Sequence, residues 1–264
     1  MSTVTQPLLT QRLRISQYQQ SGSESRDLQT ETSGTTDSLF TPGIKTASTV
    51  AMALPEGTVF KSVAAGDPLL DLIYEQLIFP FFPSNDCDER RAIDIYLANN
   101  KVNRKKRIQY HVVAALKNRA LIGATIFSFI GCENVCFMNG QYTAVMPEER
   151  RKHLAKMLSN YRVEIAQLEA RRFGYPALDL SIITLASSQN RSVAFPNPAS
   201  PDLATLQKIW RDFGHGRIHF PFVQLPLAES KASSPALLGI KRHSDRYLHR
   251  DYLTKEEMKC IVDG

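Results

Sequence analysis

A turn rich in cations is the part of the sequence best suited to chemistry. It reads Met146-Pro-Glu-Glu-Arg-Arg-Lys-His-Leu-Ala155, and it joins a β-rich run to a segment with helical periodicity. A helix N-terminus leaves backbone N–H groups unpaired and carries a partial positive charge, so it can bind a phosphate or pyrophosphate. Arg150, Arg151 and Lys152 oppose the helix dipole in the first turn, where a purely structural helix would place acids. The turn therefore predicts an anionic ligand.

The elements that position this turn have clear periodic patterns. After Pro147, apolar residues recur with helical spacing as far as about Arg172, namely Leu154, Met157, Leu158, Tyr161, Ile165 and Leu168. Before the turn, residues 107–116 and 120–130 are β-rich runs separated by Lys117-Asn-Arg119, which predicts an antiparallel hairpin. Residues 135–146 continue as a third strand.

Further elements lie on both sides of this core. A strand is expected over residues 58–63, followed by helices over 69–82, where Pro80 and Pro83 stop the pattern, and over 88–97. After the long helix, we expect a buried strand over 177–185, a helix over 203–213 and strands over 220–227 and 236–241. This order describes one α/β domain with a mixed sheet and helices on both faces.

The amino-acid composition indicates the domain boundaries, the class of partner and the location. Residues 1–58 are rich in Ser, Thr and Gln and poor in clustered apolar residues, which predicts a disordered tail before a folded domain over 59–264. The formal net charge of +6 suits nucleic acid, an acidic membrane surface or a phosphate-rich cofactor equally. No apolar stretch is long enough for a membrane span, and no secretory signal is visible. Four cysteines without a CxxC pair favour ordinary thiols and a cytoplasmic location.

The turn resembles the acyl-CoA motif of the GNAT acetyltransferase family, whose core signature is Q/R-x-x-G-x-G/A. Arg150 takes the first position and Ala155 the last, while His153 stands where the family usually has glycine. The carboxyl half, with Trp210-Arg-Asp-Phe-Gly-His215 followed by Phe220-Pro-Phe-Val-Gln-Leu-Pro-Leu227, resembles a bacterial branch of the family. The resemblance spans about residues 59–241.

The resemblance implies a GNAT-like fold, with a mostly antiparallel mixed sheet splayed in the middle and helices on both faces. It also implies an acyl-CoA co-substrate, acetyl-CoA or another, and an amine acceptor that is a small molecule or a peptide. No metal and no nucleic acid are expected. The residues that would bind the cofactor are Ala144, Val145, Met146, Arg150, Arg151, Lys152, His153, Leu154 and Ala155, the first three through their backbone as a short extra strand.

His153 leaves two interpretations open. Glycine lets a backbone approach a phosphate closely, so the Cβ and ring of a histidine can hinder that approach. When protonated, the same ring can instead add a phosphate contact.

The catalytic positions of the family are altered in this chain. The resemblance implies direct attack of an amine on the thioester, aided in some members by a glutamate base that falls on Asn139 here. Asn139 cannot act as that base, although it can hold a water. Glu133 and His111 are alternative bases, against the simpler interpretations of a solvated turn carboxylate and a satisfied strand histidine. Trp210 occupies the place of the family's tyrosine acid and will not transfer a proton. Tyr142 is a substitute, or else a packing residue.

The remaining histidine pair and basic run do not indicate a functional site. His215 and His219 lack companion ligands for a metal. The basic run Asn103–Arg107 is best explained as a solvated loop, and the chain lacks the aromatic and basic pattern of an RNA-binding sheet. Two functions remain: an acyl-CoA-dependent N-acyltransferase, and a catalytically silent module that keeps the fold and the cofactor. The sequence does not indicate the oligomeric state.

Overall fold

The computed structural model describes residues 54, 56–82, 87–186, 202–224, 234–250 and 253–263. Nearly all of the tail expected to be disordered lies outside these residues. The amino-terminal elements are β1 (Thr58–Val63), α1 (Leu69–Ile73), the π-helix η1 (Tyr74–Ile78), α2 (Phe79–Phe81), α3 (Arg90–Ala98), α4 (Asn100–Asn103) and the 3-10 helix η2 (Arg104–Lys106). The middle of the chain forms β2 (Ile108–Lys117), β3 (Ala120–Gly131), β4 (Cys136–Val145), the 3-10 helix η3 (Pro147–Glu149) and α5 (Leu154–Arg172). The carboxyl part adds β5 (Leu180–Ala186), α6 (Leu203–Asp212), β6 (Gly216–Gln224), β7 (Ser234–Arg242), α7 (Asp245–Leu248) and α8 (Lys255–Asp263).

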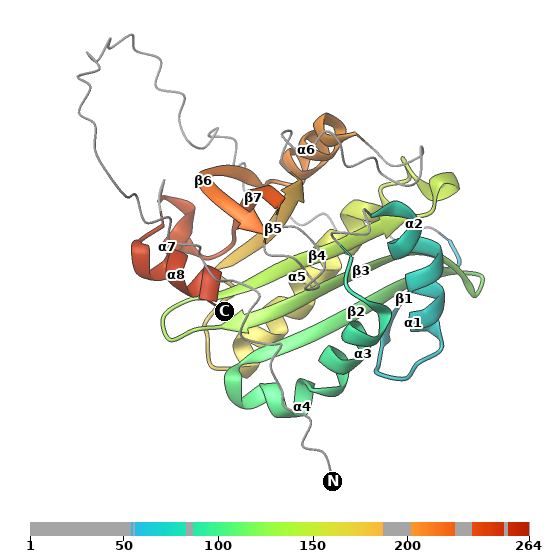
Figure 1. The fold of residues 1–264 in the computed structure, drawn as a ribbon, viewed down its shortest axis with the longest axis horizontal. Helices are drawn as coiled ribbons and strands as arrows, with labels where there is room; N and C mark the ends of the chain where they lie inside the picture. Colours follow the sequence, from blue (N-terminus) through green and yellow to red (C-terminus); the bar gives the residue numbers. More distant parts are fainter. Residues whose placement is uncertain are drawn as a thin grey trace.

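The strands form one sheet in the order β1-β2-β3-β4-β5-β7-β6 (Figure 1). Among the described strands, β4 and β5 pair in parallel and all other neighbours pair antiparallel. Helix α5 connects the two parallel strands, because a parallel pair needs a crossover connection. The predicted hairpin is confirmed: Asn118 and Arg119 take the left-handed conformation, with φ of 50° and 70°, that tight hairpin turns require.

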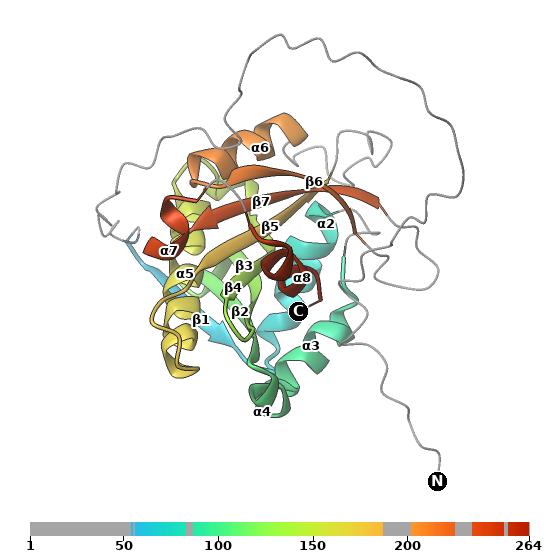
Figure 2. The ribbon, with the colours of Figure 1, turned by 90° about the vertical axis from the view of Figure 1, so that its left-hand side faces the viewer.

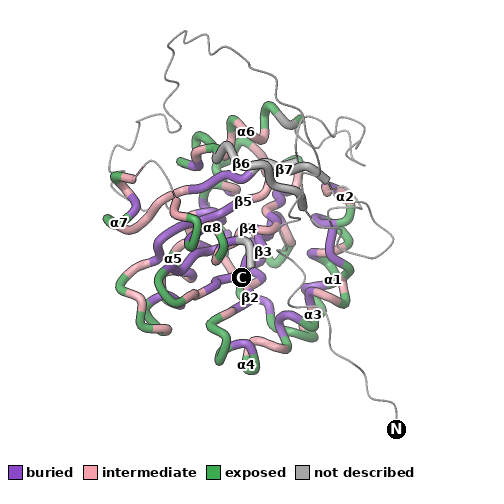
Figure 3. Tube along the Cα trace, turned by 60° about the vertical axis from the view of Figure 1, so that its left-hand side comes forward, coloured by how far each residue is buried: buried purple, intermediate pink, exposed green. Residues whose placement is uncertain are grey.

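Helices cover both faces of the sheet, as expected. Figure 2 shows α5 on one face and α1 to α3 on the other. The α5 face buries Phe127, Phe129 and Met138 of the central strands, whereas the opposite face buries Ile126 and Tyr142. In Figure 3 these central strands are buried along most of their length. The α/β class, with a mixed and mostly antiparallel sheet, is confirmed.

The start of α5 packs unusually close to the sheet, because Gly123 of β3 has no side chain. A Cβ at that position would lie 3.1 Å from the carbonyl oxygen of Ala144 and 3.3 Å from side-chain atoms of Leu154 and Leu158. The turn between β4 and α5 is therefore held directly against the central strands.

Some features near the carboxyl end differ from expectation. β6 begins at Gly216 rather than at Phe220, and α7 and α8 were not predicted. Cys132 and Cys260 form a disulfide, so the expectation of ordinary thiols is wrong for this pair, while Cys87 and Cys136 are buried in the core. Disulfides are rare in the cytosol, so this bond does not favour the expected cytoplasmic location. Among the described helices, none has the length and apolar character to cross a membrane.

Candidate functional site

The central feature of the site is a split between β4 and β5. The two strands pair from Phe137 with Leu180 to Gly140 with Ile183, and the pairing ends there. β4 continues to Val145 alongside β3, with a register shift after Gly140, while β5 continues alongside β7. The sheet is therefore splayed in the middle, as the sequence resemblance implied.

Beyond Gly140, the backbone N–H and C=O groups of alternate residues of β4 face β3, and those of the residues between them face the split. The N–H of Met146 donates to the carbonyl of Ile122 at 3.0 Å, so this residue faces β3. Because the direction alternates along a strand, Ala144 also faces β3 and Val145 faces the split. Of the three residues expected to bind a ligand through their backbone, only Val145 is oriented for it.

The turn that follows β4 places a histidine where the backbone needs a left-handed conformation. His153, at the N-cap of α5, has a φ of 61°, and Arg151 has a φ of 63°. Such values favour glycine, because an L-residue brings its Cβ close to the neighbouring carbonyl. The backbone of this chain thus adopts at His153 a conformation that a glycine would take without strain.

The N-terminus of α5 has the properties of an anion site. No side chain caps it, and its first turn contains no acid. The first N–H groups of a helix, here those of Leu154, Ala155 and Lys156, have no partner within the helix. The 3-10 helix η3 and a short turn connect the end of β4 to this end of α5 (Figure 1). The unpaired donors therefore lie at the open end of the split.

The cations of the turn have different environments. The Nε of Arg150 donates to the carbonyl of Val145 at 3.1 Å, and its guanidinium lies 4.9 Å from the ring centroid of Phe81. Burial lowers the pKa of Arg150. Lys152 pairs with Glu149 at 3.1 Å, and Arg151 and His153 are exposed. Arg150 thus ties the turn to β4, and the three cationic or basic side chains after it face solvent.

Tyr142 lies on the opposite face of β4 from α5. Its hydroxyl accepts from the N–H of Asp88 at 2.9 Å and donates to the carboxylate of Asp88 at 3.1 Å. Its ring meets Phe82 edge-on, with centroids 5.1 Å apart. Asn139 is half-buried and pairs with Ile182 in the last rows before the split. Both candidates therefore lie near the inner end of the split, and Asp88 is a neighbour that sequence reasoning missed.

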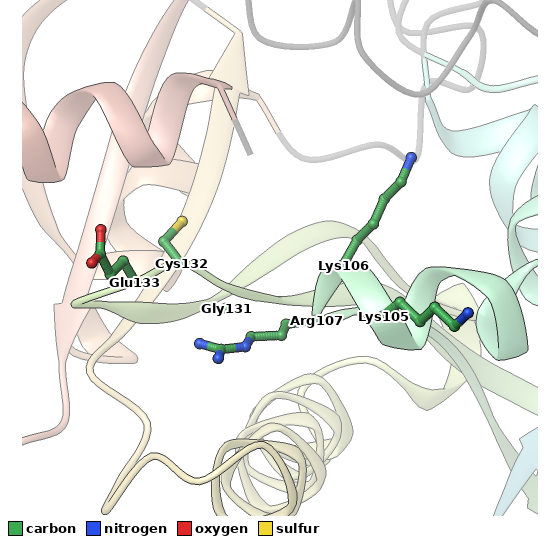
Figure 4. A pocket seen from close by; sticks show the side chains of 6 residues that line it. All are labelled: Lys105, Lys106, Arg107, Gly131, Cys132 and Glu133. Carbon is green, nitrogen blue, oxygen red and sulfur yellow. The ribbon is translucent and has the colours of Figure 1, made fainter.

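Glu133 is not brought to the split. It lies in the loop between β3 and β4, at the far end of β4 from Val145, where it lines a cavity of about 310 Å³ with Lys105, Lys106, Arg107, Gly131 and Cys132 (Figure 4). Ten residues of strand separate this loop from the turn, which is about 30 Å of chain. The geometry favours the interpretation of Glu133 as a solvated carboxylate.

The side chains of His111 and Trp210 both pack against other side chains. The His111 ring stacks on Phe127, with centroids 5.0 Å apart, and its Nε2 lies 3.5 Å from Glu169 without hydrogen-bond geometry. Burial lowers the pKa of His111 to about 4, with a further contribution from Arg172. The Trp210 ring lies over the guanidinium of Arg162 at 5.0 Å.

Arg162 is a second residue that sequence reasoning missed. It lies four residues after Leu158 and four before Ala166, on the buried face of α5. The sequence signal that could have identified it is a basic residue spaced four positions from apolar residues on the buried face of the helix. In the part of the chain that the structure describes, no cluster of three His, Cys, Asp or Glu is arranged to hold a metal.

Comparisons with known proteins show similarity of structure only. No family model matches the chain, and no curated protein matches its sequence. The structure is similar to a protein assigned to the GNAT acetyltransferases from Bacteroides thetaiotaomicron, with a TM-score of 0.49 and 12% identity over 78% of this chain and 99% of that one. It is also similar to a GNAT family acetyltransferase from Elizabethkingia anophelis with acetyl-CoA bound, with a TM-score of 0.42 and 14% identity over 72% and 100% of the two chains. Identities of this size say nothing about activity.

Proposed function

We propose that this chain is an acyl-CoA-dependent N-acyltransferase of the GNAT type, moving an acetyl or other short acyl group to an amine. The observation that carries the proposal is the juxtaposition of two features. A parallel strand pair opens beyond Gly140 and Ile183, and an uncapped, acid-free helix N-terminus lies at the end of β4. A cofactor with a long neutral arm and a diphosphate group fits both features at once.

The diphosphate would bind at the start of α5. The N–H groups of Leu154 and Ala155 point away from the helix, and the helix dipole adds partial positive charge there. Arg151 and Lys152 are exposed beside these donors and add charge. The arm would then run along the free edge of β4 and accept a hydrogen bond from the N–H of Val145, whose carbonyl accepts from Arg150.

The reaction would be direct attack of the acceptor's nitrogen on the thioester carbonyl carbon. A C–N bond forms, the C–S bond breaks, CoA leaves as a thiolate, and the nitrogen gives up a proton. The protein's task is to align the reactants and to stabilise the charge that develops on the carbonyl oxygen.

Two side chains near the inner end of the split could take part in proton transfer. Tyr142 can donate its proton to the departing thiolate only when the substrate replaces Asp88 as its acceptor. Asn139 can hold a water that accepts the proton from the amine. Glu133 lies too far away, so the base is a water or a group that the acceptor brings with it.

A specific observation favours a second candidate, a catalytically silent acyl-CoA-binding module. The residue at the position of the family's tyrosine acid, Trp210, packs against Arg162 instead of standing free. Asn139 and His153 also depart from the family pattern. Both candidates bind CoA, and they differ only in turnover.

A two-part experiment separates these candidates. Calorimetric titration with CoA measures binding, and a thiol-reactive dye measures CoA release from acetyl-CoA in the presence of a library of amines. Binding together with amine-dependent thiol release supports the acyltransferase. Binding without release supports the silent module, and the absence of binding by the folded protein contradicts both.

A further inference from the structure

A cluster of buried and half-buried basic side chains borders the inner end of the split and has no role in the function proposed above. It consists of Arg162, His215, Lys241 and His243. Arg162 is 1% exposed and His215 is 6% exposed. These side chains come from α5, from the loop before β6 and from the end of β7, and they lie on the face of the sheet that α5 covers.

The position of the cluster follows from a row of three paired residues. Gly140 of β4 pairs with Ile183 of β5, and Ile183 pairs with Gly239 of β7. A Cβ at Gly140 would lie 2.5 Å from Nη1 of Arg162, and a Cβ at Gly239 would lie 3.6 Å from Cβ of His215. Gly140 thus makes room for the Arg162 guanidinium at the last row before the strands part, and Gly239 lies within van der Waals distance of His215.

Nε2 of His243 hydrogen bonds with Oγ of Ser181, but several other groups of this cluster lack a partner among the described residues. Nη1 of Arg162 donates to Oγ1 of Thr143 at 3.3 Å, but its Nε and Nη2 have no hydrogen-bond partner in the part of the chain that the structure describes. Both ring nitrogens of His215 also lack one. Within the described residues, no carboxylate forms an ion pair with Arg162. A buried guanidinium without a counter-charge is costly, and such donors normally bind a carboxylate or another anion.

The electrostatics of the cluster also favour a bound anion. Burial lowers the pKa of Arg162 to about 10. Burial also lowers the pKa of Lys241, to which Arg162 and Lys156 contribute as like charges. The pKa of His215 is lowered by burial and then by Arg162, Lys241 and His243. The charged forms of Lys241 and His215 are disfavoured by burial and by neighbouring basic groups, and that of Arg162 by burial, so a bound anion would stabilise several of them together.

We propose that Arg162, supported by His215 and Lys241, binds a carboxylate group carried by a substrate of the reaction. This inference rests on the proposed function, which places the thioester at the inner end of the split. Arg162 lies eight residues after Leu154, about 12 Å along α5, so it is separate from the diphosphate donors. The carboxylate could belong to the far end of a dicarboxylic acyl group or to an amino-acid acceptor, and the chemistry of recognition is the same.

The chain contains a reporter inside this site. Trp210 is the only tryptophan of the sequence, and its ring lies over the Arg162 guanidinium. Its fluorescence therefore follows occupancy without any turnover. The variant Arg162→Met removes the charge and keeps the length of the side chain, and Arg171→Met, at an exposed position of the same helix, is the matched control. Gly140→Ala is a second variant, because its Cβ displaces the guanidinium.

Fluorescence titrations at constant ionic strength test the proposal in two arms. The first compares succinyl-CoA with acetyl-CoA, and the second compares amino acids with their decarboxylated amines in the presence of CoA. We expect about tenfold tighter binding of the carboxylate-bearing partner in one arm, because a hydrogen bond to a charged group contributes at least that factor. The arm that shows it identifies the source. The preference should persist in Arg171→Met and disappear in Arg162→Met and Gly140→Ala.

Two outcomes overturn the inference: no carboxylate preference in the wild-type protein, or a preference that the Arg162 and Gly140 variants retain. The proposed function fails separately, if CoA itself does not bind. In that case sodium succinate alone is titrated against sodium chloride. A change in Trp210 fluorescence that depends on Arg162 would support the anion site, and the absence of such a change would contradict it.

Discussion

His153→Gly is the substitution that best probes the turn between β4 and α5. His153 adopts a φ of 61° at the N-cap, a conformation that costs an L-residue about 1–2 kcal/mol and glycine almost nothing. Glycine loses about 0.5–1 kcal/mol more conformational entropy on folding. The net result is a gain of about 0.5–1 kcal/mol in the free energy of unfolding, which corresponds to an increase of about 1–4 °C in Tm for a chain of this size.

The same substitution should tighten CoA binding. In the proposed complex the diphosphate approaches the N–H groups that follow His153, and removal of the Cβ and ring opens that approach. His153→Ala is the control, because it removes the ring but keeps the Cβ and the backbone cost. We expect CoA affinity to rise in the order His, Ala, Gly, and Tm without ligand to rise for Gly only.

Differential scanning calorimetry and calorimetric CoA titrations at pH 6 and pH 8 provide the measurements. A glycine variant with a lower Tm than the wild type would refute the strain argument. Weaker CoA binding by both variants, more marked at pH 6, would show instead that the protonated imidazole contacts the phosphates.

Three further predictions concern other contacts of the fold. Arg150→Ala should lower the free energy of unfolding by about 1–2 kcal/mol in urea titrations and reduce the Tm increase produced by CoA, since it removes the hydrogen bond that ties the turn to Val145; an unchanged CoA effect would contradict this. Tyr142→Phe should cost about 1–3 kcal/mol, because Asp88 loses two hydrogen bonds, and a stability equal to the wild type would count against that pair. Reductant should lower the Tm of the wild type but not of Cys260→Ser, whose lost disulfide closes a long loop and is worth about 2–4 kcal/mol; equal sensitivity of both would argue against the bond.

The parts of the fold that the sequence predicted correctly are those with local signals. The apolar spacing of the long helix ends at Arg172 both in the prediction and in the structure. The hairpin around Asn118 was predicted because turn residues separate two β-rich runs. The cationic turn was found because Arg150, Arg151 and Lys152 were expected to oppose the dipole in the first helical turn, but α5 begins at Leu154 and these residues precede it.

The features that the sequence did not predict depend on contacts between distant residues. Tyr142 and Asp88 are 54 residues apart, and Cys132 and Cys260 are 128 apart. Arg162 sits on a mostly apolar helix face, and the pairing of β5 with β7 brings other basic side chains beside it. No periodic pattern encodes such contacts. Glu133 was a candidate because it precedes the motif on the same strand, and the length of β4 removes it from the split.

A crystal structure of the protein with bound CoA tests the central claim most directly. We expect the diphosphate within hydrogen-bond distance of the N–H groups of Leu154 and Ala155. The arm should lie between β4 and β5, with the sulfur near Gly140. CoA bound at another surface, or a turn that stays unoccupied at saturating CoA, would contradict the account.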